Sequence, residues 1–306
     1  MELTRKILKR VLMAVFSLFV IITLTFFLMN LIPGDPFMSE KATEESRAVL
    51  IAKYGLDQPV IVQYGRYLKN LLHGDMGTSY VLQKGRDIRT IVTESFAVSV
   101  KLGVRALLVA ILLGIPLGCI AGLFKDRLPD GIIRVVSAVG ISIPGYVNAA
   151  VLMLVFAVTL RVLPVSYGKP GGSVMPIITL AMYPTCYLAR LTRASILEVM
   201  GQDYLKTERA KGMSEAVVIF VHALKNSLVP IITYLGPLTA SVLTGGFVAE
   251  SVFNVPGLGR YFVNAISARD YTLIMGVTVF YAALIIFMNL VCDILYQIVD
   301  PRIKIG

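Results

Sequence analysis

The sequence has 306 residues, of which 56% are hydrophobic and 16% are charged, and its mean hydropathy is +0.76. A soluble globular domain averages about 45–50% apolar and about 25% charged residues, so this composition excludes an ordinary soluble domain and indicates a polytopic membrane protein. The net charge of +10 comes without a nucleic-acid motif or a basic stripe interleaved with aromatic residues. It therefore bears on membrane topology and on contact with anionic lipids.

Six apolar runs are long enough to cross a bilayer, which requires about 20 residues in a helix. In chain order they cover residues 9–32, 97–124, 133–160, 174–197, 228–249 and 273–299. The first run follows a basic stretch, as the core of a signal peptide does, but it is longer than such a core. Pro33-Gly34-Asp35-Pro36 ends it in place of a small-residue cleavage site. Residues 1–32 are therefore predicted to be an N-terminal tail and a retained first span.

The connection between the first two spans, residues 33–95, is too long for a simple turn. It contains eight basic and eight acidic residues, and it alternates amphipathic stretches with glycines. We expect it to form an extracellular cap of short helices, followed by a core of five helices over residues 96–306.

Small residues and prolines recur inside the second and third spans. They are Gly114, Pro116, Gly118, Gly140, Pro144 and Gly145. Such residues permit close packing and kinks of membrane helices, although ordinary tolerance of glycine and proline explains any single one of them equally well.

Ionisable groups at membrane depth are candidates for a functional role. In the second span Lys101 and Arg105 lie four residues apart and thus share a helix face, and in the sixth span Asn289 and Asp293 do the same. These four residues are the candidate lining of a translocation path. The alternatives are that the basic pair reaches the outer interface, and that Asp293 snorkels or makes an interhelical hydrogen bond near its helix end.

Residues 201–226 form a polar island between the fourth and fifth spans. Leu205–Lys211 consists of good helix formers, with Glu208 and Lys211 one turn apart. Gly212 is suited to the left-handed conformation that ends a helix. The first half of the island is therefore predicted to be a short helix with a glycine elbow.

The second half of the island begins with Ser214 and Glu215, which are typical of an N-cap and an acidic first turn. An apolar stripe at helical spacing follows. It consists of Met213, Val217, Phe220 and Leu224. The island as a whole is predicted to be a helix, an elbow and a second helix, which is the shape of a docking element at a membrane surface.

The distribution of basic residues predicts the orientation of the chain. The short connections on the side of the two termini contain fifteen Lys and Arg residues, against four on the other side, when the long connection 33–95 is left out. Because short cytoplasmic loops are enriched in Lys and Arg, both termini are predicted to lie in the cytoplasm.

No constellation of residues in the sequence indicates an enzyme. His73 and His222 are the only histidines, and neither stands at motif spacing from a Cys or Ser. The three cysteines lie far apart in apolar segments, which is typical of small buried side chains and not of a disulfide framework or a metal site. A P-loop is absent as well, so ATP could act only through a partner chain.

A series of short motifs identifies a family resemblance. In chain order they are PGDP (33–36), YGLDQPVIVQY (54–64), GDMGTSY (74–80), DRLPD (126–130), SIPGY (142–146), RAKGMSE (209–215), HALKNSLVPIITYLG (222–236), FNVPGLGR (253–260), RDY (269–271) and DPRIK (300–304). In their order and spacing the chain resembles, nearly end to end, the permease subunits of binding-protein-dependent ABC importers. Within that family it is most similar to the first permease of the dipeptide, oligopeptide and nickel group.

The resemblance implies an all-α polytopic membrane protein with six transmembrane helices, in the type I ABC importer permease fold with a large extracellular loop after the first helix. It further implies a bacterial or archaeal cell (inner) membrane as the location. The implied partners are a homologous second permease, two cytoplasmic ABC ATPases and an extracellular or periplasmic substrate-binding protein. This chain itself would bind no cofactor, and ATP and Mg would be bound by the ATPases.

The resemblance also implies that residues 201–226 are the "EAA" segment, which docks into the ATPase. Gly212 fits the glycine of that pattern, whereas Lys206-Thr207-Glu208 stands where an acidic-Ala-Ala triplet is usual and the Leu-Pro is displaced to Val229-Pro230. The residues implied to couple to the ATPase are Asp203, Tyr204, Glu208, Arg209, Ala210, Lys211, Gly212, Met213 and Ser214.

The implied substrates are di- or oligopeptides. Nickel ranks lower because two remote histidines do not provide a path with imidazole or soft ligands. An ion-coupled secondary transporter would show an internal inverted repeat and charge pairs at the midplane, and neither is clear. A membrane scaffold that transports nothing is the remaining alternative.

Overall fold

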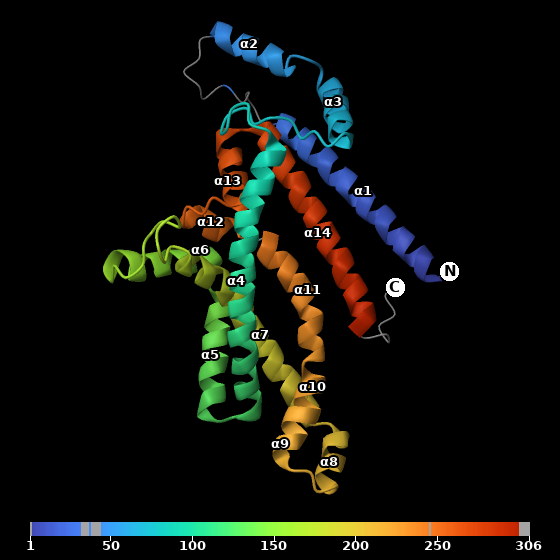
Figure 1. The fold of residues 1–306 in the computed structure, drawn as a ribbon, viewed down its shortest axis with the longest axis vertical. Helices are drawn as coiled ribbons and strands as arrows, with labels where there is room; N and C mark the ends of the chain where they lie inside the picture. Colours follow the sequence, from blue (N-terminus) through green and yellow to red (C-terminus); the bar gives the residue numbers. More distant parts are fainter. Residues whose placement is uncertain (1, 32–36, 38–43, 245, 300–306) are drawn as a thin grey trace. The chain divides into compact units, whose positions relative to one another are not determined.

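The computed structural model describes residues 2–31, 37, 44–244 and 246–299, which fold into helices joined by turns (Figure 1). The motifs at 33–36 and 300–304 lie outside these residues. The chain divides into two compact units. Unit 1 consists of Met1–Val98 and Pro256–Phe287, and unit 2 consists of Ser99–Val255 and Met288–Gly306.

Five helical stretches in the described part of the chain are long and apolar enough to cross a membrane, and a bent pair of helices brings the number to six if it counts as one span. The five stretches are Lys9–Leu31, Ile88–Leu123, Val174–Met200, Val229–Val252 and Tyr271–Cys292. They belong to helices α1 (Glu2–Leu31), α4 (Ile88–Leu123), α7 (Val174–Met200), α11 (Val229–Thr244) with α12 (Phe247–Val252), and α14 (Tyr271–Val299). The predicted all-helical membrane architecture is confirmed.

The third predicted span, 133–160, is not one continuous helix. In its place α5 (Leu128–Ser142) is followed by α6 (Gly145–Leu152) and a π-helical continuation, η1 (Met153–Thr159), with a bend of 106° between α5 and α6. Pro144 causes the break, because it lacks an N–H group and forces the residue before it out of the helical conformation. Ile143 accordingly has φ −78° and ψ 120°.

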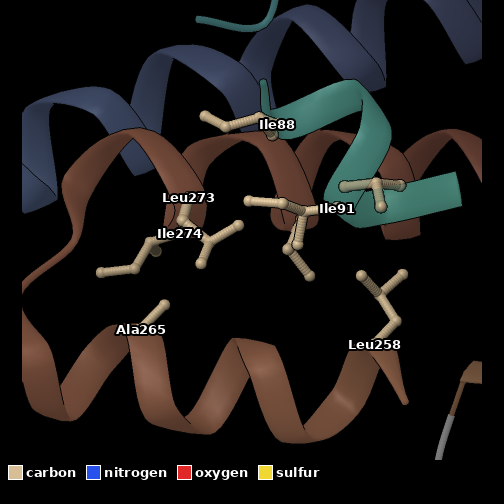
Figure 2. Packing of buried hydrophobic residues seen from close by; sticks show 8 residues of the cluster. Ile88, Ile91, Leu258, Ala265, Leu273 and Ile274 are labelled. Carbon is tan, nitrogen blue, oxygen red and sulfur yellow. The ribbon is translucent and has the colours of Figure 1, made fainter. Parts of the chain in front are cut away.

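The core of unit 1 is formed where the beginnings of α4 and α14 meet α13 (Leu258–Ala268). Figure 2 shows Ile88 and Ile91 of α4 pointing toward Leu273 of α14 and Leu258 of α13. All of these side chains are at most 1% exposed. Because burial of apolar surface is the main favourable contribution to packing, this cluster is what joins sequence segments about 180 residues apart.

Two short helices occupy the predicted cap region, α2 (Glu44–Tyr54) and α3 (Val60–Leu72). One face of α3 packs on α1 and α14 around Phe26. The Tyr64 hydroxyl also lies 2.7 Å from the hydroxyl of Thr23 on α1. The amphipathic pattern of this region thus reflects a helix whose apolar side is covered by the first membrane helix.

Asp270 fastens the loop before α4 to the start of α14. Its carboxylate is fully buried. It accepts hydrogen bonds from the Ser79 hydroxyl and from the backbone N–H groups of Tyr80, Val81 and Leu82. It also accepts bonds from the Thr272 hydroxyl and the Leu273 N–H group. A buried carboxylate needs such a set of donors to offset the loss of hydration.

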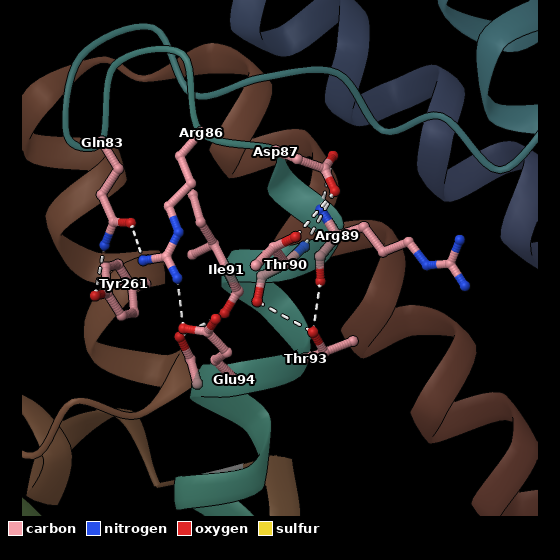
Figure 3. Close-up of polar contacts among 10 residues, drawn as sticks. Gln83, Arg86, Asp87, Arg89, Thr90, Ile91, Thr93, Glu94 and Tyr261 are labelled. Carbon is pink, nitrogen blue, oxygen red and sulfur yellow. Dashed lines mark hydrogen bonds and ion pairs between the residues drawn. The ribbon is translucent and has the colours of Figure 1, made fainter.

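The loop enters α4 through a second polar network (Figure 3). Asp87 caps the helix, since its carboxylate accepts the N–H groups of Arg89 at 3.4 Å and Thr90 at 3.3 Å. Arg86 pairs with Glu94 in the second turn of α4 and also donates to Gln83, whose amide donates to the Tyr261 hydroxyl of α13. These bonds fix where α4 begins, nine residues before the predicted start of the second span at residue 97.

Unit 2 is organised around α7, which α4 approaches closely through three glycines. Added Cβ atoms at Gly114, Gly118 and Gly122 would lie 2.7, 2.4 and 2.8 Å from atoms of α7, so side chains are excluded there. At the start of α5 the buried carboxylate of Asp130 accepts two hydrogen bonds from Arg193 of α7, at 2.6 and 2.8 Å. Glycine contacts and a two-pronged ion pair thus hold α4 and α5 against the same helix.

We expect Asp270→Ala to release the loop 77–87 from α14. The change leaves the Ser79 hydroxyl and several N–H groups without an acceptor, and each buried donor left unpaired costs about 1–3 kcal/mol. Hydrogen exchange of residues 77–87 in the purified protein should accelerate strongly. Asp57→Ala, at an exposed position of the cap, is the control and should leave exchange unchanged, and equal protection in both variants would contradict the role of Asp270.

We expect Gly118→Ala to destabilise the contact between α4 and α7. The new methyl group would lie 2.4 Å from Thr192 Cβ and 2.5 Å from the Ala189 carbonyl oxygen, and such overpacking costs about 1–3 kcal/mol. The thermal unfolding midpoint in detergent should fall. Gly131→Ala on α5 has nothing within 4 Å of the new atom and should leave the midpoint unchanged or raise it slightly.

Candidate functional site

The polar island of the sequence forms a small helical subdomain at one end of unit 2 (Figure 1). It contains α8 (Asp203–Ala210), α9 (Glu215–Val217), a π-helical segment η2 (Val218–Ala223) and α10 (Leu224–Ser227). α7 runs into this subdomain and α11 runs out of it. The segment is therefore continuous with two membrane helices.

The elbow at Gly212 has the geometry that its sequence predicts. Gly212 has φ +82°, in the left-handed region. Its N–H group donates to the Arg209 carbonyl at 3.0 Å, and the Met213 N–H group donates to the Glu208 carbonyl at 3.4 Å. This pair of bonds is a Schellman motif, which satisfies the last carbonyls of α8. Only glycine adopts such a conformation without a steric cost from Cβ.

An ion pair joins the two helices that flank the elbow. Arg209 at the end of α8 donates two hydrogen bonds to Glu215 at the start of α9, at 3.0 and 2.7 Å. The hydrogen bond from Arg209 is the largest cause that holds the pKa of Glu215 below its ordinary value. Since both side chains are partly exposed, this pair selects the angle of the elbow more than it stabilises the fold.

A buried cluster anchors the subdomain to α7. Leu205, Val218 and Ala223 are at most 2% exposed, and Val199 and Met200 at the end of α7 pack against them. A buried hydrogen bond reinforces the anchor, since Ser195 of α7 donates to the Ser227 carbonyl at 2.8 Å. Within the subdomain, Asn226 donates to the Tyr204 hydroxyl at 2.7 Å in an exposed hydrogen bond. Movement of the elbow is therefore expected to move α7 with it.

The face opposite the anchor is apolar and exposed. Met213, Val217, Phe220 and Val221 are 37, 40, 65 and 55% exposed. Three of these belong to the predicted stripe, and its fourth member, Leu224, is partly buried. The π-helical turn of η2 moves Val218 and Ala223 to the inner face and leaves the stripe outside. An exposed apolar patch with a polar rim is typical of a protein interaction site.

The predicted coupling residues all lie on this subdomain. Asp203 pairs with Lys206 at 2.8 Å and Lys211 pairs with Glu208 at 3.0 Å, as the one-turn spacing predicted for the latter pair. The second carboxylate oxygen of Glu208 is buried without a hydrogen-bond partner among the described residues. Ala210 and Ser214 are exposed. Ser214 stands at the N-cap of α9 as predicted, but its side chain makes no capping hydrogen bond.

The four predicted path residues, unlike the coupling residues, are not gathered in one small part of the structure. Lys101 and Arg105 are exposed on one face of α4, and Asn289 is exposed on α14. The side chain of Asp293 lies outside the described residues. Within the part of the chain that the structure describes, no ion pair joins the basic pair to an acidic residue.

Sequence reasoning missed the residues that shape the site from within. The ion pair of Arg209 with Glu215 could have been found, because opposite charges flank a chain reversal at Gly212. The Leu205, Val218 and Ala223 cluster could not, because it depends on a π-helical turn that no residue pattern in the island marks.

Two family models match the chain. "Binding-protein-dependent transport system inner membrane component" matches residues 114–305, and the N-terminal model of binding-protein-dependent transport system membrane components matches residues 3–86.

Individual proteins and solved structures are also similar. The chain is 42% identical to the dipeptide transport system permease protein DppB of Bacillus subtilis, over 99% of both chains. It is 41% identical to the oligopeptide transport system permease protein OppB of Haemophilus influenzae, over 97% of this chain and 98% of that one.

A crystal structure of an amino acid ABC transporter with histidines superposes with a TM-score of 0.56 at 15% identity, over 68% of this chain and 94% of that one. The MetNI methionine ABC transporter superposes with a TM-score of 0.54 at 12% identity, over 69% and 97%. At this identity the two structures support the fold alone.

We expect Glu215→Gln to loosen the elbow. The lowered folded-state pKa of Glu215 means that the pair stabilises the elbow above the ordinary carboxyl pKa and that this contribution is lost as pH falls through the lowered value. Hydrogen exchange of residues 208–216, corrected for its intrinsic pH dependence, should be a few-fold faster in Glu215→Gln at pH 7. Wild type should approach the variant only in acid. Glu198→Gln, which changes an exposed residue of α7, is the control. Identical exchange in wild type and Glu215→Gln at pH 7 would show that the ion pair of Arg209 with Glu215 does not hold the elbow.

Proposed function

The chain belongs to the family of binding-protein-dependent transport system inner membrane components, and on that basis we propose that it is the permease subunit of an importer of di- or oligopeptides. It is a membrane-spanning transport subunit and not an enzyme. The observation that carries the peptide assignment is 42% identity to a dipeptide permease over 99% of both chains. Nickel import and ion-coupled secondary transport are not favoured by these relatives.

The proposed assembly contains this chain, a homologous second permease, two cytoplasmic ABC ATPases and an extracellular or periplasmic substrate-binding protein. ATP and Mg would be bound by the ATPases, and this chain would bind no cofactor. Three of the motifs, at 33–36, 54–64 and 74–80, lie in the cap over residues 33–95, where docking of the binding protein is proposed. The cap over residues 33–95 supports this role, because α3 is held on α1 by an apolar face and by Tyr64.

The proposed orientation places both termini and the coupling subdomain in the cytoplasm. It is supported by the fifteen Lys and Arg residues in the short connections of that side, against four on the other. In this orientation the subdomain of α8, α9 and α10 faces the ATPases and residues 33–95 face the opposite side.

Coupling to the ATPase is proposed to run through the elbow. The exposed apolar face around Phe220 would enter a groove of the ATPase, and the charged rim of Asp203, Arg209 and Lys211 would set its orientation. The unpartnered oxygen of Glu208 is an acceptor for a donor of the ATPase. Because Leu205 and Val218 fasten the subdomain to the end of α7, closure of the ATPases would tilt α7 and convert the bundle between inward-open and outward-open states.

The translocation path is proposed to lie between the two permeases, with Lys101, Arg105, Asn289 and Asp293 as lining residues. The first three support this role because they are exposed on membrane helices of the single subunit. Charged groups in that position need water or a protein partner, since lipid offers neither.

Reconstitution tests the proposed function. Proteoliposomes that contain the complete importer should accumulate a labelled dipeptide or tripeptide when ATP and the binding protein are supplied on their respective sides. Nickel should not be accumulated. ATP-independent uptake by this chain alone, driven by an ion gradient, would overturn the proposal.

We expect Gly212→Val to impair ATPase assembly or transport without affecting membrane insertion. No atom lies within 4 Å of the position of an added Cβ, so the effect is conformational. A β-branched residue in the left-handed region costs about 1–2 kcal/mol or more, which opens the Schellman motif. Gly212→Asn is the matched control because Asn tolerates this conformation, and it should retain most activity. Co-purification of the ATPases and ATP-driven uptake are the measurements, and full assembly with wild-type uptake in Gly212→Val would refute the proposal that coupling runs through the elbow.

A further inference from the structure

A half-open cavity of about 260 Å³ lies at the break between α5 and α6 within unit 2. Residues of α5, the break, α6 and α7 line it. They are Gly140, Ile141, Ser142, Ile143, Pro144, Gly145, Asn148, Met182 and Tyr183. None of them belongs to the predicted path or coupling residues.

Backbone groups at the break lack the partners that a continuous helix provides. The Gly140 carbonyl has no donor four residues later, because Pro144 has no N–H group. At the start of α6 the N–H groups of Val147 and Asn148 both donate to the Pro144 carbonyl, no side chain caps the helix, and the first N–H groups of any helix have no partner inside it. In a membrane protein irregular backbone of this kind is tolerated only where it is buried or lines a hydrated cavity.

Asn148 points to a ligand at this cavity. It lies in the first turn of α6, it is only 7% exposed, and it lines the cavity. Its side-chain amide has no hydrogen-bond partner among the described residues. Its amide nitrogen and oxygen are not among the fully buried unpaired side-chain atoms, so they are accessible from the cavity that the residue lines. A primary amide offers both donors and an acceptor, so it is able to pair with a peptide group from both sides.

The two half-helices give the cavity poles of opposite charge. The C-terminal end of α5 carries partial negative charge and the N-terminal end of α6 carries partial positive charge. A peptide with free ends carries an ammonium group, which the first pole attracts, and a carboxylate group, which the second pole attracts. Discontinuous membrane helices bind charged substrate groups at such ends in other transporters.

On the side of α7 the cavity wall consists of Met182 and one aromatic residue, Tyr183. Tyr183 of α7 is 48% exposed and stacks on Tyr187 with ring centroids 6.1 Å apart. Tyr187 stacks in turn on Tyr234 of α11 at 4.4 Å. Close packing of α5 on α7 holds this wall in place, since a Cβ atom at Gly140 would lie 2.4 Å from the Cys186 sulfur. Aromatic faces accommodate apolar side chains of many shapes and select little among them.

We propose that this cavity is a subsite for the peptide main chain in the translocation path. Asn148 and the N–H groups at the start of α6 donate to substrate carbonyls or to the terminal carboxylate, and the last carbonyls of α5 accept from substrate N–H groups or the terminal ammonium. Recognition of the main chain alone lets one path pass peptides of many sequences. This inference rests on the proposed function, because it takes peptides as the substrate.

A photo-crosslinking amino acid at position 183 tests the location. In the complete importer, crosslinking to a radiolabelled peptide should appear during ATP hydrolysis and should be reduced by excess unlabelled peptide. The same amino acid at position 135, on an exposed face of α5 that does not line the cavity, should give no crosslink. Equal crosslinking at both positions, or none at 183 in a variant that still imports peptide, would overturn the subsite.

Asn148→Leu tests the chemistry. Loss of the proposed hydrogen bonds should lower the amount of peptide imported per ATP hydrolysed by roughly five- to tenfold, while ATP hydrolysis stimulated by the binding protein stays close to that of wild type. The thermal unfolding midpoint should not fall, because an amide without a protein partner contributes no bond to the fold. A lower midpoint together with unchanged import per ATP would assign Asn148 a structural role and refute the proposal.

The two hypotheses fail in different ways. If the wild-type importer takes up no peptide with ATP and binding protein present, the proposed function is wrong. If wild type imports peptide, crosslinking at position 183 equals that at position 135, and Asn148→Leu imports as much peptide per ATP as wild type, then the function stands and the subsite is wrong.

Discussion

The close approach of α4 to α7 through Gly114, Gly118 and Gly122 fixes the helix on which the rest of unit 2 depends. Apolar side chains alone do not favour one helix pair over another in lipid, because lipid is as apolar as they are. Small residues that let backbones touch supply the missing specificity. The buried ion pair of Asp130 with Arg193 adds α5 to the same helix. A charge pair at this depth is costly unless fully bonded, and here both carboxylate oxygens of Asp130 accept from Arg193.

α7 also connects the two places to which function is assigned. Its middle carries Met182 and Tyr183, which line the cavity at the helix break, and its end carries Val199 and Met200, which pack on the coupling subdomain. Tight packing transmits displacement because a packed interface changes between discrete arrangements and does not deform smoothly. A tilt imposed at Gly212 would thus reach the cavity through a single helix, without a separate relay of side chains.

Polar groups in this chain are concentrated where helices begin, end or break. Asp270 collects donors from the loop before α4 at the start of α14, Asp87 caps α4, and Asn148 stands in the first turn of α6. The reason is that helix ends leave backbone groups without partners and that a membrane provides no water to satisfy them. The first two sites are fully bonded and hold the fold together, whereas the amide of Asn148 has no hydrogen-bond partner among the described residues, and its proposed binding role rests on this difference.

The sequence by itself determined the membrane class, the positions of the long apolar helices and the elbow, because these depend on local properties: about 20 consecutive apolar residues, and a glycine at the one position that needs φ +82°. It also marked Pro144 and Gly145 as residues that permit a kink in the third span. The direction of that kink, a bend of 106° with a cavity beside it, came only from the tertiary structure. So did the bonds of Asp130 to Arg193 and of Asp270 to Ser79, which join residues 63 and 191 positions apart. Helical periodicity cannot predict such pairs, since their geometry is set by how separate helices pack and not by the spacing of residues along one of them.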